Sequence, residues 1–244
     1  MRSLLAALNL LRGIGHLLHG MWTIATRFGG ASREQRAQHI AEWSRGLLRL
    51  VNVTVKIQGT PQAHGPLLVV LNHVSWLDIL VMLAAQPVCF VSKSEVRHWP
   101  LIGWLATNVG TLYIERASRR DAMRVVHQVA EQLQAGGIIA VFPEGTTSDG
   151  ASVLPFHGNM LQAAISAHCP VQPVALRFIE VSGQRSMSPI YIDDDTLLSS
   201  VWRMLRAQPV TASLDFMPPV STAGQDRRAL AAQLQGLIAE RLNS

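Results

Sequence analysis

The sequence predicts an α/β protein with a mainly parallel or mixed sheet that helices cover on both faces. Three observations favour this fold class. Short apolar runs alternate with helical segments through the middle of the chain, which is the pattern of strand–helix units. One run, residues 66–71, is almost entirely aliphatic, as expected for a strand buried on both faces of a sheet. With 244 residues, of which 48% are hydrophobic, the chain can also bury a full core.

The first 28 residues are rich in leucine, alanine, glycine and isoleucine and predict a helical segment. Their longest stretch without Asp, Glu, Lys or Arg is residues 13–26, which is 14 residues long. Because a membrane-spanning helix needs about 20 apolar residues, this favours a segment that lies in the membrane interface. A signal peptide is the alternative, but no small-x-small cleavage site follows before the polar residues 33–38.

Residues 32–50 predict a basic amphipathic helix, because four arginines alternate with apolar residues at helical spacing. Such a helix either packs on the domain surface or docks on anionic phospholipid. The chain is therefore divided into a membrane-associating helical segment, residues 1–50, and an α/β domain, residues 51–244.

Charge and cysteine content restrict the partners and the compartment. The net charge of +5 suggests an anionic partner. A lipid surface fits better than nucleic acid, because only Lys56 and Lys93 are lysines and the arginines form no basic stripe interleaved with aromatic residues. The two cysteines, Cys89 and Cys169, lie in apolar stretches without C-x-x-C spacing. They are predicted to be buried, reduced thiols in a cytosolic setting.

The other elements follow from periodicity and turn residues. Residues 51–58 alternate valine and isoleucine with polar residues and predict a half-buried strand. Residues 77–85 predict an apolar helix, and residues 226–242 a strongly periodic closing helix. The other expected strands are 87–91, 110–114, 137–142, 171–178 and 210–216, and the other expected helices are 100–107, 118–134 and 158–168.

An imidazole and a carboxylate, His73 and Asp78, lie five residues apart just after the buried strand. On one continuous helix this offset would separate the two side chains by about 140°. They can meet only if His73 lies in the loop and Asp78 in the first turn of the following helix. In that arrangement the carboxylate fixes the imidazole tautomer and leaves the other ring nitrogen free to take a proton from a substrate.

Four motifs occur in order between about residues 50 and 180: NHVSWLDI, GTLYIER, FPEGTTSDG and VQPVAL. The first contains H-x4-D, and together they resemble the four blocks of the glycerolipid acyltransferases, the family of 1-acyl-glycerol-3-phosphate acyltransferases. The resemblance implies membrane-associated helices at the N-terminus. It also implies that His73 is the catalytic base and that Asp78 orients it.

The second and third blocks contain the expected substrate-binding residues. The resemblance implies that Arg116, which follows a strand, binds the phosphate of the acceptor and that Glu144 helps to arrange the acceptor site. From the residues themselves, Gly145 permits a tight turn, and the Thr146 and Thr147 hydroxyls with nearby backbone N–H groups could cradle an oxyanion or phosphate. Thr147 stands where the commoner pattern FPEGTRS has arginine, which removes one candidate phosphate contact.

Three other positions near these motifs have alternative roles. Ser75 invites a Ser-His-Asp interpretation, but the chain has no G-x-S-x-G elbow. His157 is a second titratable candidate, expected to cap or pack a helix, and Pro173 is expected to shape a strand. No metal site is expected at the first motif, since its His and Asp offer two ligands where a catalytic site generally needs three.

The sequence therefore predicts an enzyme that transfers a fatty acyl group from acyl-CoA or acyl carrier protein to a lysolipid hydroxyl, without a cofactor. Lysophosphatidic acid, giving phosphatidic acid, is the first choice of acceptor, and a lyso-ornithine lipid is the alternative because of Thr147. A lipid hydrolase and a non-catalytic membrane-surface binding protein are alternatives of other classes. The enzyme is expected on an anionic membrane surface, at the cytoplasmic face of the inner membrane.

Overall fold

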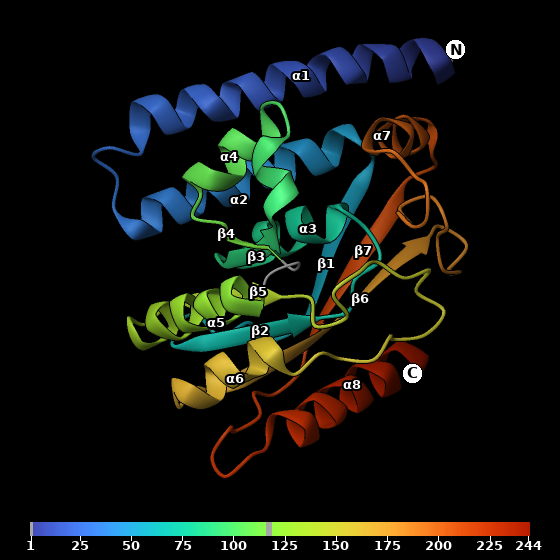
Figure 1. The fold of residues 1–244 in the computed structure, drawn as a ribbon. Helices are drawn as coiled ribbons and strands as arrows, with labels where there is room; N and C mark the ends of the chain where they lie inside the picture. The colour runs from blue at the N-terminus through green and yellow to red at the C-terminus, as the bar shows by residue number, and fades with distance from the viewer. Residues whose placement is uncertain (1, 116–118) are drawn as a thin grey trace.

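The computed structural model describes residues 2–115 and 119–244, and Figure 1 shows its fold. In this part of the chain seven strands form one sheet in the order β1-β7-β6-β2-β5-β3-β4. Neighbouring strands are parallel, except that β6 and β7 are antiparallel. The strands are β1 (Val53–Gly59), β2 (Leu67–Leu71), β3 (Cys89–Lys93), β4 (Leu112–Ile114), β5 (Ile138–Val141), β6 (Val171–Glu180) and β7 (Val210–Phe216). The predicted α/β class with a mainly parallel, mixed sheet is confirmed.

Helices cover both faces of this sheet (Figure 1). Two of them precede the first strand, and the others connect strands or close the chain. In the described residues they are α1 (Arg2–Arg27), α2 (Arg33–Leu50), α3 (Leu77–Ala85), α4 (Ile102–Asn108), α5 (Arg119–Gln134), α6 (Asn159–Ser166), α7 (Leu197–Arg206) and α8 (Arg227–Asn243), with a short 3-10 helix η1 (Ser94–His98).

Side chains of the central strand β2 alternate between two hydrophobic cores. Leu67, Val69 and Leu71 face the core that α2, α3 and α7 cover, whereas Leu68 and Val70 face the core that α5, α6 and α8 cover. All five are at most 1% exposed, because a parallel strand with helices on both faces of its sheet has no solvent-exposed side. The carboxyl end of β2, where the first motif begins, is therefore held from both faces.

The first two helices form an antiparallel pair over one face of the sheet (Figure 1). A capping box begins α2, since the Ser32 hydroxyl accepts the Gln35 N–H while the Gln35 side chain accepts the Ser32 N–H. Ala6 of α1 and Leu48 of α2 are buried in the same core as α3. Among the described residues no helix is long and apolar enough to cross a membrane. The division of the chain at residue 50 stays a prediction.

The structure contains one substantial helix that the sequence analysis does not anticipate. Helix α7 has the sequence LLSSVWRMLR, in which two serines interrupt the apolar run. A capping box of Thr196 and Ser199 begins it, and the Arg203 side chain donates to the carbonyl of Ser188 and pairs with Asp195. Leu197, Val201 and Leu205 recur every fourth residue, so the segment has an apolar stripe, and these tertiary contacts stabilise it further.

The two cysteines are free thiols, but they differ in burial. Cys169 is buried as predicted, whereas Cys89 at the start of β3 is only half-buried, so its predicted full burial is wrong. Burial raises the pKa of both thiols. Both are therefore poorly ionised, unreactive side chains at neutral pH.

Candidate active site

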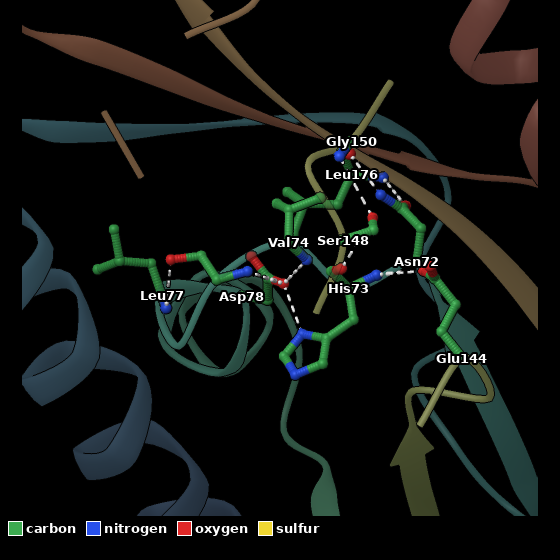
Figure 2. Close-up of polar contacts among 10 residues, drawn as sticks. Asn72, His73, Val74, Leu77, Asp78, Glu144, Ser148, Gly150 and Leu176 are labelled. Carbon is green, nitrogen blue, oxygen red and sulfur yellow. Dashed lines mark hydrogen bonds and ion pairs between the residues drawn. The ribbon is translucent and has the colours of Figure 1, made fainter. Parts of the chain in front are cut away.

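His73 and Asp78 lie at the carboxyl end of β2, on the two sides of the turn into α3 (Figure 2). His73 is in the loop and Asp78 is in the first helical turn. The Nδ1 atom of His73 lies 2.8 Å from Oδ2 of Asp78. The His73 side chain is 18% exposed and that of Asp78 is fully buried. A substrate can thus reach the imidazole but not the carboxylate.

The same carboxylate oxygen organises the whole turn. Oδ2 of Asp78 also accepts the backbone N–H groups of Val74 at 2.8 Å and Ser75 at 2.9 Å. Because a carboxylate oxygen can only accept, Nδ1 of His73 carries the hydrogen of the shared bond. This fixes the tautomer and leaves the lone pair of Nε2 free, and in the described part of the chain no group is hydrogen-bonded to Nε2.

Glu144 holds the backbone of His73. Its Oε1 accepts the His73 N–H at 2.6 Å (Figure 2). Its Oε2 accepts the Leu154 N–H at 3.0 Å. The side chain is 3% exposed. Burial raises the pKa of Glu144, and its bonds to the two N–H groups only partly oppose this. Glu144 therefore ties the main chain of His73 to Leu154, further along its own loop.

The loop after β5 also fixes the imidazole ring and the His73 carbonyl. The Phe142 ring stacks on the imidazole with centroids 3.8 Å apart and planes 12° apart. The Phe90 ring stacks on Phe142 in turn, with centroids 5.5 Å apart. The Ser148 N–H donates to the His73 carbonyl at 2.8 Å. The ring, the N–H and the carbonyl of His73 are thus all held by residues 142–148.

The other expected substrate-binding residues lie in or near this loop. Gly145 has a φ of +73° and donates its N–H to the Phe142 carbonyl, so the tight turn requires glycine. Thr146 is exposed and Thr147 is half-buried, and they lie two and three residues after Glu144. Arg116 lies outside the described residues. The structure therefore brings Gly145, Thr146 and Thr147 close in the chain to Glu144 and does not place Arg116.

Ser75 is not available as a nucleophile. Its side chain is fully buried, and its hydroxyl accepts the Leu77 N–H at 3.2 Å. His157 is exposed, so the expected packing role is wrong, and only its backbone N–H bonds to Pro143. Pro173 is a residue of β6 whose carbonyl accepts the Met217 N–H, as expected of a strand position.

Three residues that support the site were not singled out from the sequence: Asn72, Phe142 and Ser148. The Asn72 side chain donates to the Leu176 carbonyl at 3.0 Å and accepts the Leu176 N–H at 2.8 Å, which ties the end of β2 to β6. Phe142 and Ser148 lie inside the third motif, but their contacts with His73 join positions about 70 residues apart. No local pattern in the sequence reports such contacts.

The described residues contain no group of three or more His, Cys, Asp or Glu side chains that could hold a metal ion. The groups that the structure does bring together at this site are a histidine with one free ring nitrogen, a buried carboxylate that stabilises its protonated form, and a loop rich in backbone N–H groups.

Comparisons with known proteins identify the family of this chain. A family model described as acyltransferase matches residues 52–177. The chain is 37% identical over 217 residues to the lyso-ornithine lipid O-acyltransferase of Pseudomonas aeruginosa, covering 88% of this chain and 83% of that protein. It is also 37% identical over 212 residues to the 1-acyl-sn-glycerol-3-phosphate acyltransferase of Neisseria meningitidis, covering 86% of this chain and 82% of that protein.

The fold has a counterpart among solved structures. The crystal structure of the 1-acyl-sn-glycerophosphate acyltransferase of Thermotoga maritima superposes with a TM-score of 0.76 at 21% identity, covering 100% of this chain and 97% of that one. At that identity the likeness concerns the fold alone. The family model matches more than half of this chain, and both relatives align with most of it. The chain therefore belongs to the acyltransferase family.

Proposed function

We propose that this protein transfers a fatty acyl group from a thioester, acyl-CoA or acyl carrier protein, to the free hydroxyl of a lysolipid. The observation that supports this proposal most strongly is the His73–Asp78 pair, in which Nδ1 is engaged and Nε2 is free. Membership of the acyltransferase family supports the same reaction class.

His73 acts as the general base. Nε2 takes the proton of the acceptor hydroxyl while the hydroxyl oxygen attacks the thioester carbonyl carbon. The resulting imidazolium is stabilised by the buried Asp78 carboxylate, 2.8 Å from Nδ1. When the carbon–sulfur bond breaks, Nε2 returns the proton to the departing thiolate. The products are the acylated lipid and the free thiol, and no covalent enzyme intermediate forms.

Glu144 and Phe142 position the base. Glu144 fixes the backbone N–H of His73, and Phe142 keeps the ring from rotating by stacking on it. The direct route is preferred to an acyl-enzyme route because Ser75, the hydroxyl nearest in the chain, is buried and bonded to Leu77. The buried Ser75 hydroxyl also argues against a serine hydrolase, which needs an accessible nucleophile beside the histidine.

Lysophosphatidic acid, giving phosphatidic acid, is the proposed acceptor. The N. meningitidis relative is named for this substrate, and the second motif supplies Arg116 for a phosphate. Thr147, in place of the arginine of the commoner pattern, supports a second candidate, the acylation of a lyso-ornithine lipid, for which the P. aeruginosa relative is named.

The test is an acyl-transfer assay with labelled acyl-CoA and acyl carrier protein against both acceptors. Thr147→Arg should raise or preserve kcat/KM for lysophosphatidate, since it adds a guanidinium that can bind the phosphate dianion. It should leave unchanged or reduce kcat/KM for the lyso-ornithine lipid. A wild-type preference for the lyso-ornithine lipid would overturn the phosphatidate assignment, while hydrolysis without transfer would overturn the transferase itself.

The proposed site of action is a membrane surface, at the cytoplasmic face of the inner membrane. Helix α1 supports this proposal, because large apolar side chains along it are exposed: Leu4, Leu5, Leu8, Leu11, Ile14, Leu18 and Trp22. Such a stripe on one helix suits burial in the interface. The membrane-bound protein should be released by high salt or high pH, and release only by detergent would contradict an interfacial mode.

A further inference from the structure

We infer that the cleft between α1 and α2 is a binding site for the phosphate group of an anionic membrane lipid, separate from the catalytic loop. The cleft has a volume of about 510 Å³, and two arginines, two histidines and two glycines line it: Arg12, Arg49, His16, His19, Gly15 and Gly46. Its size is that of a small-ligand site. The inference rests on the membrane-surface part of the proposed function, because a lipid headgroup reaches the cleft only from a bilayer.

The two walls of the cleft are held at a fixed separation by a reciprocal contact. The Nε2 atom of His16 donates to the Trp43 carbonyl at 2.8 Å, and Nε1 of Trp43 donates to the His16 carbonyl at 2.9 Å. The two rings stack with centroids 5.3 Å apart. Gly46 and Gly20 make room for these rings, since a Cβ there would lie 2.5 Å from the imidazole and 2.4 Å from the indole. The cleft is therefore part of the packed helix pair.

The charge in the cleft is uncompensated. Arg12 and Arg49 are exposed, and neither takes part in an ion pair within the described ranges 2–115 and 119–244. Arg12 donates only to the neutral amide of Asn9. The sequence of α1 contains no acidic residue, and the acids of α2, Glu34 and Glu42, do not line the cleft. Two free guanidinium groups facing one cavity match the oxygens of a phosphate.

The apolar stripe of α1 identifies the source of that phosphate. Five of its members lie close together around the helix and are between 43% and 77% exposed: Leu4, Leu8, Leu11, Leu18 and Trp22. Since each residue turns about 100° around the helix axis, these five residues share one side of the helix. Arg12 and His19 are rotated about the same axis by roughly 60° to 85° from the middle of that side. If the stripe enters the acyl region, these two side chains sit at the depth of the headgroups. A lipid phosphate fits this placement better than a soluble one.

The experiment measures partitioning onto phosphatidylcholine vesicles with and without phosphatidylglycerol. Arg12→Gln with Arg49→Gln should weaken partitioning onto the anionic vesicles about 25-fold, from about five-fold for each basic residue at the surface. The matched control is Arg227→Gln with Arg228→Gln, which removes the same charge from α8 on the opposite side of the molecule (Figure 1). This control should weaken partitioning less than about two-fold. Equal melting temperatures show that the variants are folded.

A third variant separates a site from diffuse surface charge. Gly15→Gln fills the cleft without changing its charge, and a Cβ at Gly15 meets nothing within 4 Å, so the fold tolerates it. It should weaken partitioning onto anionic vesicles at least five-fold. Wild-type behaviour of this variant, or equal losses in the two double variants, would overturn the site.

The remaining outcomes distinguish this inference from the function on which it rests. If the wild type binds neutral and anionic vesicles equally, the headgroup site is wrong and membrane association stands. If it binds neither, the membrane-surface proposal itself is wrong. If Arg12→Gln with Arg49→Gln abolishes binding of inorganic phosphate to the protein in solution but leaves partitioning onto anionic vesicles unchanged, the cleft binds free phosphate and the lipid source is wrong.

Discussion

Asp78→Asn isolates the electrostatic contribution of the buried carboxylate. The new side-chain oxygen can take the place of Oδ2 and accept the N–H groups of Val74 and Ser75 and Nδ1 of His73. The new NH₂ group then occupies the place of Oδ1, which is buried and has no partner among the described residues. The shape of the site is kept and a negative charge is removed. We expect the protein to fold, with a stability loss of about 3 kcal/mol for one buried NH₂ group, whose two N–H donors are unsatisfied.

The loss of rate follows from the charge that develops during the reaction. Two unit charges about 4 Å apart attract by about 4 kcal/mol at an effective dielectric constant of about 20. Since each 1.36 kcal/mol is tenfold in rate, the full attraction corresponds to roughly 10³. The proton is only partly transferred in the transition state, so kcat should fall by about 10² to 10³. KM for the acceptor should change little, because Asp78 is fully buried and cannot touch it.

The assay is steady-state acyl transfer, with Asp149→Asn as a matched control. Asp149 is exposed, and its side chain accepts the Ala151 N–H while its carbonyl accepts the Arg185 side chain. The variant can keep both bonds, so it should retain wild-type rates. His73→Ala should lose about 10² to 10⁴ in kcat, and adding Asp78→Asn to it should cost little more, because the pair works as a unit. A folded Asp78→Asn enzyme within about tenfold of wild type would refute the reasoning.

Three further outcomes test the support of the site. Burial raises the pKa of Glu144 above its ordinary value of 4.5, so the folded protein binds this proton more tightly than the unfolded chain does. As pH rises from 4.5, the unfolding free energy of the wild type should therefore fall relative to that of Glu144→Gln. A wild-type advantage that grows with pH in urea titrations would contradict this. Phe142→Leu should lower kcat several-fold by losing a stack worth about 0.5 to 1.5 kcal/mol, and unchanged kinetics would show that the ring needs no such support. Gly46→Ala should lower the free energy of unfolding by about 1 to 3 kcal/mol, because the new Cβ would clash with the imidazole of His16 in α1. Gly15→Ala should not lower it. Equal melting temperatures of these two variants would remove the argument for a fixed helix pair.

The parts of the structure that depend on nearby residues are readable from the sequence. The helix at 77–85 and the strand at 210–216 have the predicted bounds, because their apolar runs are bounded by clear turn residues. The His73–Asp78 contact is of the same kind. It joins residues five apart, so the spacing and the strand-to-helix turn are enough to anticipate it.

The parts that depend on distant pairing are not readable in this way. Helix α7 has an apolar stripe of its own, but its position on the domain depends on the contacts of Arg203 with Ser188 and Asp195. Asn72 meets Leu176 across 104 positions. Sequence reasoning gave Glu144 a role in the acceptor site, whereas its contacts in the structure are with the main chain of His73 and Leu154.

The register of the sheet explains why the first and third motifs meet. Strands β2 and β5 are parallel neighbours, and Val70 pairs with Val141. His73 and Glu144 each lie three residues beyond this pair in their own loops. Two loops that leave the same edge of a sheet at the same level place equivalent positions side by side. The 2.6 Å bond between the His73 N–H and Glu144 therefore follows from strand pairing, and a one-residue slip between β2 and β5 would separate the base from its support before any catalytic side chain had changed.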